Sequence, residues 1–357
     1  MKRSQNLIRT LSATIATLAL AAGTALPVQA KTLNMAWSGG TAAEAEQNTF
    51  IAAFEEATGA KVELKASELA LLAQLESMVK IGKTTWDLVE LSGGKLPLAV
   101  EKDLLEPLDY SVIDPDNQLP EMARHEYGIV WGTYSTVLVQ NTAKNPEGKK
   151  MASWEDFWDV NTFPGPRSLR AWPKENLEYA LLADGVDKDD IYDVLGTEEG
   201  LDRAFSKLDE IKDHIPVWWE NGAQSVQLLA DEEVDYATTF NGRVNKLVQE
   251  GTPAEIVWNG GALMMGQMGI PKGAKNVDLA HEYIKMRVLD ADIERDYLEY
   301  IPYPNFAPGL IDTLPEEVAR SLPASPENVE LQFVSNDQFW ADNIDHIQER
   351  WNEWMLE

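Results

Sequence analysis

Strand-like and helix-like segments alternate from residue 31 onward, and this order limits the fold more than any other feature of the chain. Residues 31–37 and 61–66 are predicted strands, and the second of them alternates apolar and polar side chains. Helices are predicted over residues 42–58, from a closing glycine, and over 68–81, from the helical spacing of apolar side chains. Residues 86–91 form a third, more apolar strand. A strand–helix–strand–helix–strand order produces a parallel sheet with right-handed crossovers, so the predicted fold class is α/β.

The same two patterns recur through the rest of the chain. A long β-rich run over residues 128–140 indicates a crossing into a second lobe. Further strands are predicted over residues 217–219, 236–240 and 262–270, further helices over residues 201–211, 223–230 and 277–289, and an acidic C-terminal tail carries Trp340, Trp351 and Trp354 at roughly helical spacing.

Charge and cysteine content exclude several classes of function. Acidic side chains outnumber basic ones by 59 to 30, which gives a formal charge of −29. Since phosphate binding needs a basic surface, no nucleic-acid partner is expected. The chain contains no cysteine, and this excludes a disulfide framework, thiol catalysis, thiolate metal sites and an N-terminal lipid-anchored cysteine.

The first thirty residues have the pattern of a secretory signal peptide. Lys2, Arg3 and Arg9 form a basic head, and an apolar stretch follows over residues 11–22. That stretch is well short of the roughly 20 residues that cross a bilayer. Small residues at the end of the segment predict cleavage after Ala30, so the mature protein is expected to be soluble in the periplasm.

Motifs for catalysis, metals and cofactors are absent from the sequence. There is no nucleophile elbow, phosphate-binding loop or dinucleotide fingerprint. The histidines are far apart and lack the spacing of a zinc helix; they are His125, His214, His281 and His346. The chain is therefore not expected to be an enzyme or to hold a metal or a cofactor.

Aromatic and small polar side chains gather where predicted strands end. In a parallel α/β sheet, ligands bind beyond the carboxyl ends of the strands, in pockets with apolar walls and few polar groups. Each of these tryptophans alone is more typical of a core, and Arg243 alone is equally typical of a surface ion pair. Taken together they predict a binding cleft formed by Trp37, Ser38, Ser92, Trp172, Trp219, Phe240, Asn241, Arg243 and Tyr303.

These segments resemble a known family over essentially the whole predicted mature chain. The runs WDLVELSGG, FPGPRSLR, TTFNGR and GIPKGAKN, behind an export signal, are similar to the spermidine/putrescine-type periplasmic solute-binding proteins of ABC importers. The resemblance implies a type II clamshell in which each of two lobes is a mainly parallel sheet flanked by helices. It also implies a small organic solute and an inner-membrane ABC permease as partners, and a monomer is expected.

The resemblance further implies where the lobes divide. The chain is expected to cross between them near Val139, Gly261 and Asn305. Lobe 1 then comprises residues 31–138 and 262–304, and lobe 2 comprises residues 139–261 and 305–357, after a signal peptide over residues 1–30.

The cleft residues depart from the polyamine-binding pattern. Trp37, Ser38, Ser92 and Tyr303 match the family, but residues 39–40 are glycines in place of an acid and an aromatic residue. One second-lobe aspartate of the family falls on Arg243, and an ammonium-binding aspartate falls on Gly266. Glu175 and Glu178 stay as acidic candidates that either face the cleft or face solvent.

These departures predict the ligand class. A buried diamine without a carboxylate partner is costly, whereas a guanidinium holds a carboxylate with two parallel bonds. We therefore expect a small carboxylic acid or zwitterion held by Arg243 and aromatic side chains. A polyamine is the alternative ligand. A secreted enzyme or a structural surface protein is a less favoured class of function.

Overall fold

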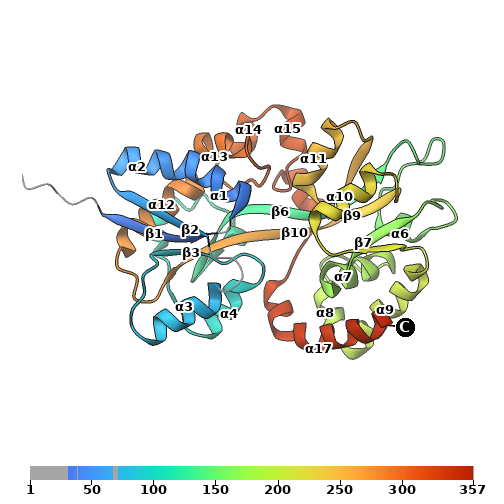
Figure 1. Ribbon diagram of the computed structural model, residues 1–357, viewed down its shortest axis with the longest axis horizontal. Helices are drawn as coiled ribbons and strands as arrows, with labels where there is room; N and C mark the ends of the chain where they lie inside the picture. Colours follow the sequence, from blue (N-terminus) through green and yellow to red (C-terminus); the bar gives the residue numbers. More distant parts are fainter. Residues whose placement is uncertain (1–30, 38, 67–70, 357) are drawn as a thin grey trace, which may run out of the picture. The chain divides into compact units, whose positions relative to one another are not determined.

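The computed structural model describes residues 31–37, 39–66 and 71–356 (Figure 1). The predicted signal peptide and Ser38 lie outside the described residues, together with residues 67–70 and 357.

The predicted parallel sheet of the first lobe is confirmed. Strand β1 (Thr32–Trp37) pairs in parallel with β2 (Lys61–Ala66) on one side and with β3 (Leu88–Glu90) on the other. The helix predicted over residues 42–58 is a continuous helical stretch with a π-helical turn in its middle, comprising α1 (Gly40–Glu46), η1 (Gln47–Ile51) and α2 (Ala52–Thr58). The second predicted helix is α3 (Leu71–Lys80).

Two long antiparallel strands carry the sheet from the first lobe into the second. They are β6 (Gly128–Asn141) and β10 (Ala254–Pro271), which run side by side through the molecule (Figure 1). The sheet order is β2-β1-β3-β10-β6-β9-β7-β8. The sheet is therefore mixed, because β10 is antiparallel to β3 and β6 is antiparallel to β9.

The strands of the second lobe are parallel to one another. Strand β7 (Arg167–Arg170) pairs in parallel with β8 (Val217–Trp219) and with β9 (Tyr236–Phe240). Helices α10 (Gly222–Ala230) and α11 (Asn241–Gln249) begin directly after β8 and β9. The starts of these helices therefore lie at the carboxyl ends of the strands, where ligands are expected.

The remaining elements connect and cover the sheet. The helices are α4 (Lys95–Glu101), α5 (Tyr110–Ile113), η2 (Glu121–Ala123), α6 (Trp154–Trp158), α7 (Pro173–Ala183), α8 (Ile191–Leu195), α9 (Glu198–Lys212), α12 (Val277–Leu289), α13 (Ala291–Leu298), α14 (Leu310–Thr313), α15 (Glu316–Arg320), α16 (Pro326–Leu331) and α17 (Asp337–Leu356), and the short strands are β4 (Leu105–Glu106), β5 (Arg124–His125) and β11 (Phe333–Val334).

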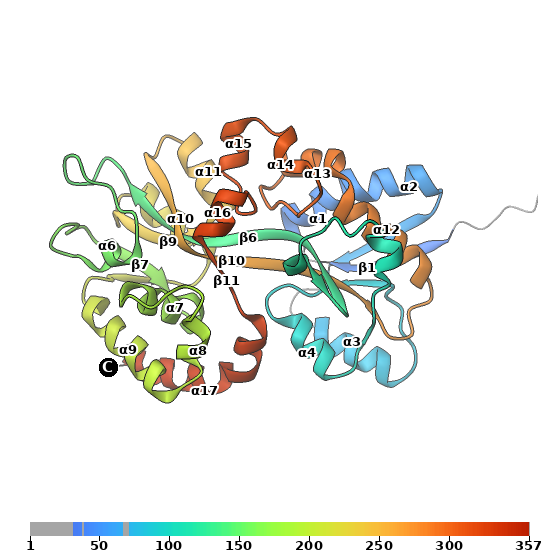
Figure 2. The same ribbon diagram turned by 180° about the vertical axis from the view of Figure 1, so that it is seen from behind.

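Each lobe buries apolar side chains on both faces of its part of the sheet. In the first lobe, α2 and α12 lie on one side of the strands and α3 and α4 on the other (Figures 1 and 2). In the second lobe, α7, α9 and α17 contribute to the core on one face, and α10 and α11 contribute to the core on the other. The two-lobed α/β fold predicted from the sequence is thus present.

A buried charged network fixes the segment near the predicted third crossing. The guanidinium of Arg287 lies 3.1 Å from a Glu46 oxygen and 2.6 Å from a Glu294 oxygen, and all three side chains are fully buried. The backbone N–H of Asn305 donates to Glu294 over 2.8 Å, and its side-chain amide donates to the Arg287 carbonyl over 2.7 Å. Asn305 is therefore attached to helices of the first lobe, and the division of lobes at residue 305 stays a prediction.

Candidate ligand-binding site

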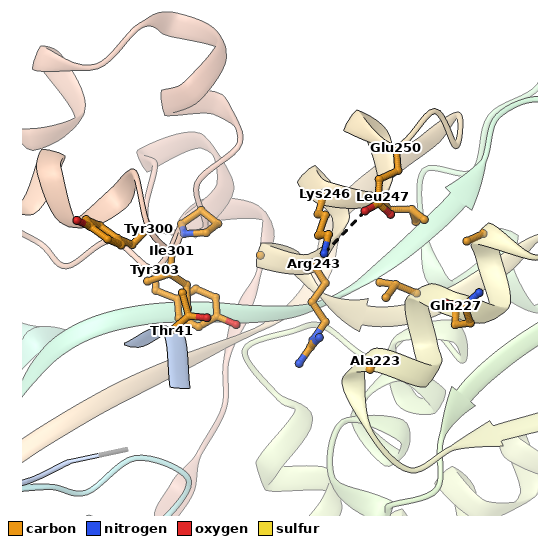
Figure 3. Close-up of a pocket in the computed structure, with 14 residues that line it drawn as sticks. Thr41, Ala223, Gln227, Arg243, Lys246, Leu247, Glu250, Tyr300, Ile301 and Tyr303 are labelled. Carbon is orange, nitrogen blue, oxygen red and sulfur yellow. Dashed lines mark ion pairs between the residues drawn. The ribbon is translucent and has the colours of Figure 1, made fainter. Parts of the chain in front are cut away.

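A cavity of about 510 Å³ is lined by the start of α1, by α10 and α11 along their length, and by the segment that follows α13. The first lobe contributes Thr41 and residues 300–303, and the second lobe contributes side chains of α10 and α11 (Figure 3). Arg243 and Tyr303, both predicted site residues, line it. The only ion pair drawn among its lining residues joins Lys246 to Glu250 over 3.8 Å on α11.

Arg243 stands in the first turn of α11, and its side chain is exposed in the cavity (Figure 3). No acidic side chain among the described residues lies within salt-bridge distance of it. A Cβ atom at Gly222 would lie 2.6 Å from the Arg243 Nε and 2.8 Å from the Phe240 ring. Glycine at position 222 therefore allows the guanidinium and this ring to lie against the start of α10.

Phe240 belongs to a row of aromatic rings from β6, β8, β9 and the segment after α13. Phe240 meets Trp219 edge to face at 5.8 Å and Tyr134 edge to face at 6.1 Å, and Tyr134 lies 5.5 Å from Tyr303. Burial raises the pKa of the Tyr303 hydroxyl, and the nearby Arg243 acts in the opposite direction. Tyr134 was not predicted from the sequence, because nothing in the β-rich run around it distinguishes it from a core residue.

A second guanidinium, that of Arg170, lies beside the same rings. Its carbon is 5.5 Å from the centre of the Trp219 ring and 5.8 Å from that of Phe240. Its Nη1 lies 3.3 Å from an oxygen of Glu175, whose side chain is buried. Burial raises the pKa of Glu175, and Arg170 lowers it only in part. Arg170 was also missed by sequence reasoning.

Asn241 has a structural role, because its side chain joins the start of α11 to neighbouring segments. It is buried, its side-chain oxygen accepts from the Ser135 backbone N–H over 2.8 Å, and its amide donates to the Pro302 carbonyl over 3.5 Å. The start of α11 is thereby joined to β6 and to the segment that carries Tyr303. A Cβ atom at Gly242 would lie 2.9 Å from the Tyr303 ring, so these two segments are in close contact.

Trp37, which was predicted to lie against a ligand, has a core position in this structure, and its contact with a ligand stays a prediction. Trp37 is fully buried, and its ring centre lies 4.9 Å from that of Trp131 within the core of the first lobe. Trp219 is also fully buried, and its indole N–H donates to Thr238 over 3.0 Å. Trp219 supports Phe240 and Arg170 from behind, and neither tryptophan has an open ring face in this structure.

Phe240, Asn241, Trp172 and Ser92 are further predicted residues that do not line the cavity. Trp172 precedes α7 and is 37% exposed. Ser92 is partly buried after β3, and its hydroxyl oxygen has no hydrogen-bond partner among the described residues. Ser38 lies outside the described residues, so its position relative to the cavity stays a prediction.

The acidic candidates face neither solvent nor the cavity. Glu178 is fully buried, and one of its oxygens accepts from the Trp340 indole over 2.7 Å and from the Tyr192 hydroxyl over 3.1 Å. Burial raises the pKa of Glu178 to about 7. Glu178 therefore joins α7 and α8 to α17, while Glu175 engages Arg170.

The described residues contain no group of three or more histidine, aspartate or glutamate side chains arranged to hold a metal ion. Within the same part of the chain, every helix is too short or too polar to cross a membrane.

A two-lobed α/β protein whose cavity is lined by both lobes has the architecture expected of a solute-binding protein, since ligand pockets occur preferentially between domains. Comparison with known proteins agrees with this assignment. The profile of the bacterial extracellular solute-binding proteins matches residues 49–324, and the chain belongs to this family. The family consists of solute-binding proteins rather than enzymes, is periplasmic in Gram-negative bacteria, and supplies the substrate-binding components of ABC importers.

Three relatives illustrate the range of the family. The gamma-aminobutyric acid-binding protein of Pseudomonas aeruginosa is 36% identical over 283 residues, which cover 79% of each chain. The spermidine/putrescine-binding periplasmic protein of Escherichia coli is 25% identical over 242 residues, covering 66% of this chain and 65% of the relative. The crystal structure of an ABC transporter substrate-binding protein from Bradyrhizobium japonicum superposes with a TM-score of 0.79 at 33% identity, covering 91% of this chain and 99% of the other.

Proposed function

We propose that this substrate-binding component captures a small zwitterionic carboxylic acid of the size of gamma-aminobutyric acid. The observation that carries the proposal is the Arg243 guanidinium, which is exposed in the cavity and has no acidic partner among the described residues. A guanidinium holds a carboxylate with two parallel hydrogen bonds. Tyr303, which lines the cavity, provides apolar surface for the body of such a ligand. The ligand of the relative from Pseudomonas aeruginosa has this chemistry.

The polyamine alternative is weakened at the position of Gly266. The family resemblance puts an ammonium-binding aspartate there, but a Cβ atom at Gly266 would lie 2.8 Å from the Trp131 ring. Trp131 is itself buried against Trp37, so the ring has little room to move. The site thus lacks the space for this carboxylate, and a guanidinium stands where another family aspartate is expected. A diamine would leave its ammonium groups poorly compensated.

The proposal also covers the export of the protein and the membrane partner to which it delivers its solute. Residues 1–30 would direct export and be removed after Ala30, and the loaded protein would deliver its solute to an ABC permease in the inner membrane. We propose a monomer as the working form.

A panel of ligands tests the solute class directly. Thermal unfolding of the mature protein should shift upward with 4-aminobutanoate and with other short amino acids, because a ligand that binds only the folded state stabilises it by mass action. Putrescine and spermidine at the same concentrations should produce a much smaller shift. If the polyamines stabilise the protein and the acids do not, the polyamine function replaces the one proposed.

Replacing Arg243 by alanine should weaken binding of the acid by about 1–3 kcal/mol, the range for truncating an important contact residue. The expected loss is smaller than for a pair that is already buried, because the guanidinium is exposed before the ligand arrives. Isothermal titration calorimetry measures the change. Arg295→Ala, which removes an exposed guanidinium paired with Asp292 on α13, is the matched control and should bind like the unmodified protein. Equal affinities of the two variants would contradict the role of Arg243.

A further inference from the structure

Arg170 ends β7, and its guanidinium lies beside the rings of Trp219 and Phe240 in the second lobe. Its carbon lies over Trp219 at 5.5 Å and over Phe240 at 5.8 Å, and its side chain is 31% exposed. Contact of a guanidinium with aromatic faces fixes its plane and leaves the N–H groups at its edge available. The strand end and the two rings therefore hold this side chain in a defined orientation.

The hydrogen-bonding capacity of Arg170 is only partly used. A guanidinium has five N–H donors, and a strong charge-assisted bond to a carboxylate is about 2.7–2.9 Å long. Nη1 of Arg170 lies 3.3 Å and 3.5 Å from the two oxygens of Glu175. No other acceptor for this side chain is found among the described residues. The pair is thus long, and the other two guanidinium nitrogens, Nε and Nη2, have no partner in the described part of the chain.

Two guanidinium groups therefore flank one aromatic ring. Phe240 has Arg170 over its ring, and the edge of the same ring shares the space above Gly222 with Arg243 Nε. Glu175 is the one carboxylate that contacts either guanidinium among the described residues, and it contacts only Arg170. Two neighbouring like charges repel each other unless an anion lies between them. A ligand with one carboxylate would pair with one of these guanidinium groups and leave the other without an anionic partner.

We propose that the ligand carries two acidic groups, with Arg243 holding one and Arg170 holding the other. The inference rests on the proposed function and makes it narrower: the solute is an amino acid with two carboxylates rather than one. Arg170 is then the residue that determines specificity, and Glu175 positions it before the ligand binds.

A matched pair of ligands tests the second acidic group. Glutamate is 4-aminobutanoate with one more carboxylate, so the ratio of their dissociation constants reports on that group alone. Calorimetry with the mature protein should give at least about tenfold tighter binding for glutamate, a factor of ten being 1.4 kcal/mol. Comparable affinities for the two ligands would overturn this inference and leave the proposed function standing. Binding of putrescine with neither acid bound would instead reject the proposed function.

Variants of Arg170 test which residue binds the additional carboxylate of glutamate. Arg170→Gln should reduce the ratio of the two dissociation constants to near one, because the loss falls mainly on glutamate. Arg170→Lys keeps a charge beside Glu175, protects the fold, and should retain part of the ratio. Arg203→Gln, at an exposed arginine paired with Asp184, is the control and should keep the full ratio. If Arg170→Gln keeps the ratio of dissociation constants of the unmodified protein, Arg170 does not bind the second acidic group.

Glu175→Gln is expected to change the preference for glutamate in the direction opposite to Arg170→Gln. This change removes the carboxylate that competes for Arg170, so the preference for glutamate over 4-aminobutanoate should increase a few-fold. A purely structural role of the pair predicts equal effects on both ligands. A decrease of the ratio in this variant would also overturn the proposal.

Discussion

Replacing Trp37 by alanine is expected to lower the free energy of unfolding by about 3–5 kcal/mol, the usual cost of truncating a fully buried tryptophan. The side chain has no exposed surface and packs at 4.9 Å against Trp131. It also stands at the end of β1, where the sheet is covered by helices on both faces, so the surrounding structure cannot collapse into the space left behind. Urea unfolding of the mature protein measures this change.

Trp172→Ala is the matched control for this prediction. Trp172 is 37% exposed at the start of α7, so its truncation should cost about 1 kcal/mol or less, as surface substitutions usually do. If Trp37→Ala unfolds like the unmodified protein but binds the solute weakly, Trp37 contacts the ligand as the sequence predicted. Loss of stability without that selective effect assigns it to the core.

Trp37 also illustrates which properties can be predicted from the sequence. The alternation of segments correctly predicted a parallel sheet, because each helical crossover requires parallel neighbours. The structure adds the order, with β1 between β2 and β3. The alternation also placed Trp37 at a strand end. The residue that covers it, Trp131, belongs to β6 and comes much later in the chain. Burial depends on packing against residues that are distant in the sequence, and the local periodicity of a segment gives no information about them.

The same reason explains why Arg170 was missed. Its neighbours Trp219 and Phe240 end β8 and β9, which lie on either side of β7 in the sheet. The order of strands in a sheet differs from their order in the chain, so these three strand ends could not be brought together before the structure was known. Arg243 could be predicted, since the departure from the family pattern is visible at a single position.

Glu178 shows a different limit. The sequence left it between the cleft and solvent, and the structure places it in neither environment, because Trp340 and Tyr192 surround its carboxyl group. An acidic residue in a helix is usually exposed. Only the approach of α17 and α8 makes this one buried, and both contacts are long-range.

The burial of Glu178 predicts an unusual dependence of stability on pH. Burial raises its pKa from 4.5 to about 7 in the folded protein, with a smaller raising effect from Glu175, while hydrogen bonding to Trp340 and the charge of Lys174 oppose the shift. Between these two pH values the folded state binds more protons than the unfolded state. The stabilising contribution is therefore complete below about pH 4.5 and is lost as the pH rises through about 7.

The protein is expected to be more stable near pH 5 than near pH 8, with Glu178 alone contributing about 2–3 kcal/mol of the difference. Glu294, whose pKa burial also raises to about 7, acts in the same direction. Glu178→Gln keeps an acceptor for Trp340 and Tyr192 without a charge, so it should raise the free energy of unfolding at pH 8 and change it little at pH 5. Urea unfolding at both values measures the effect, and Glu282→Gln, at an exposed carboxylate of α12, should keep the slope of the unmodified protein. If Glu178→Gln also keeps that slope, Glu178 is ionised in the folded state across this range, and another group compensates its charge.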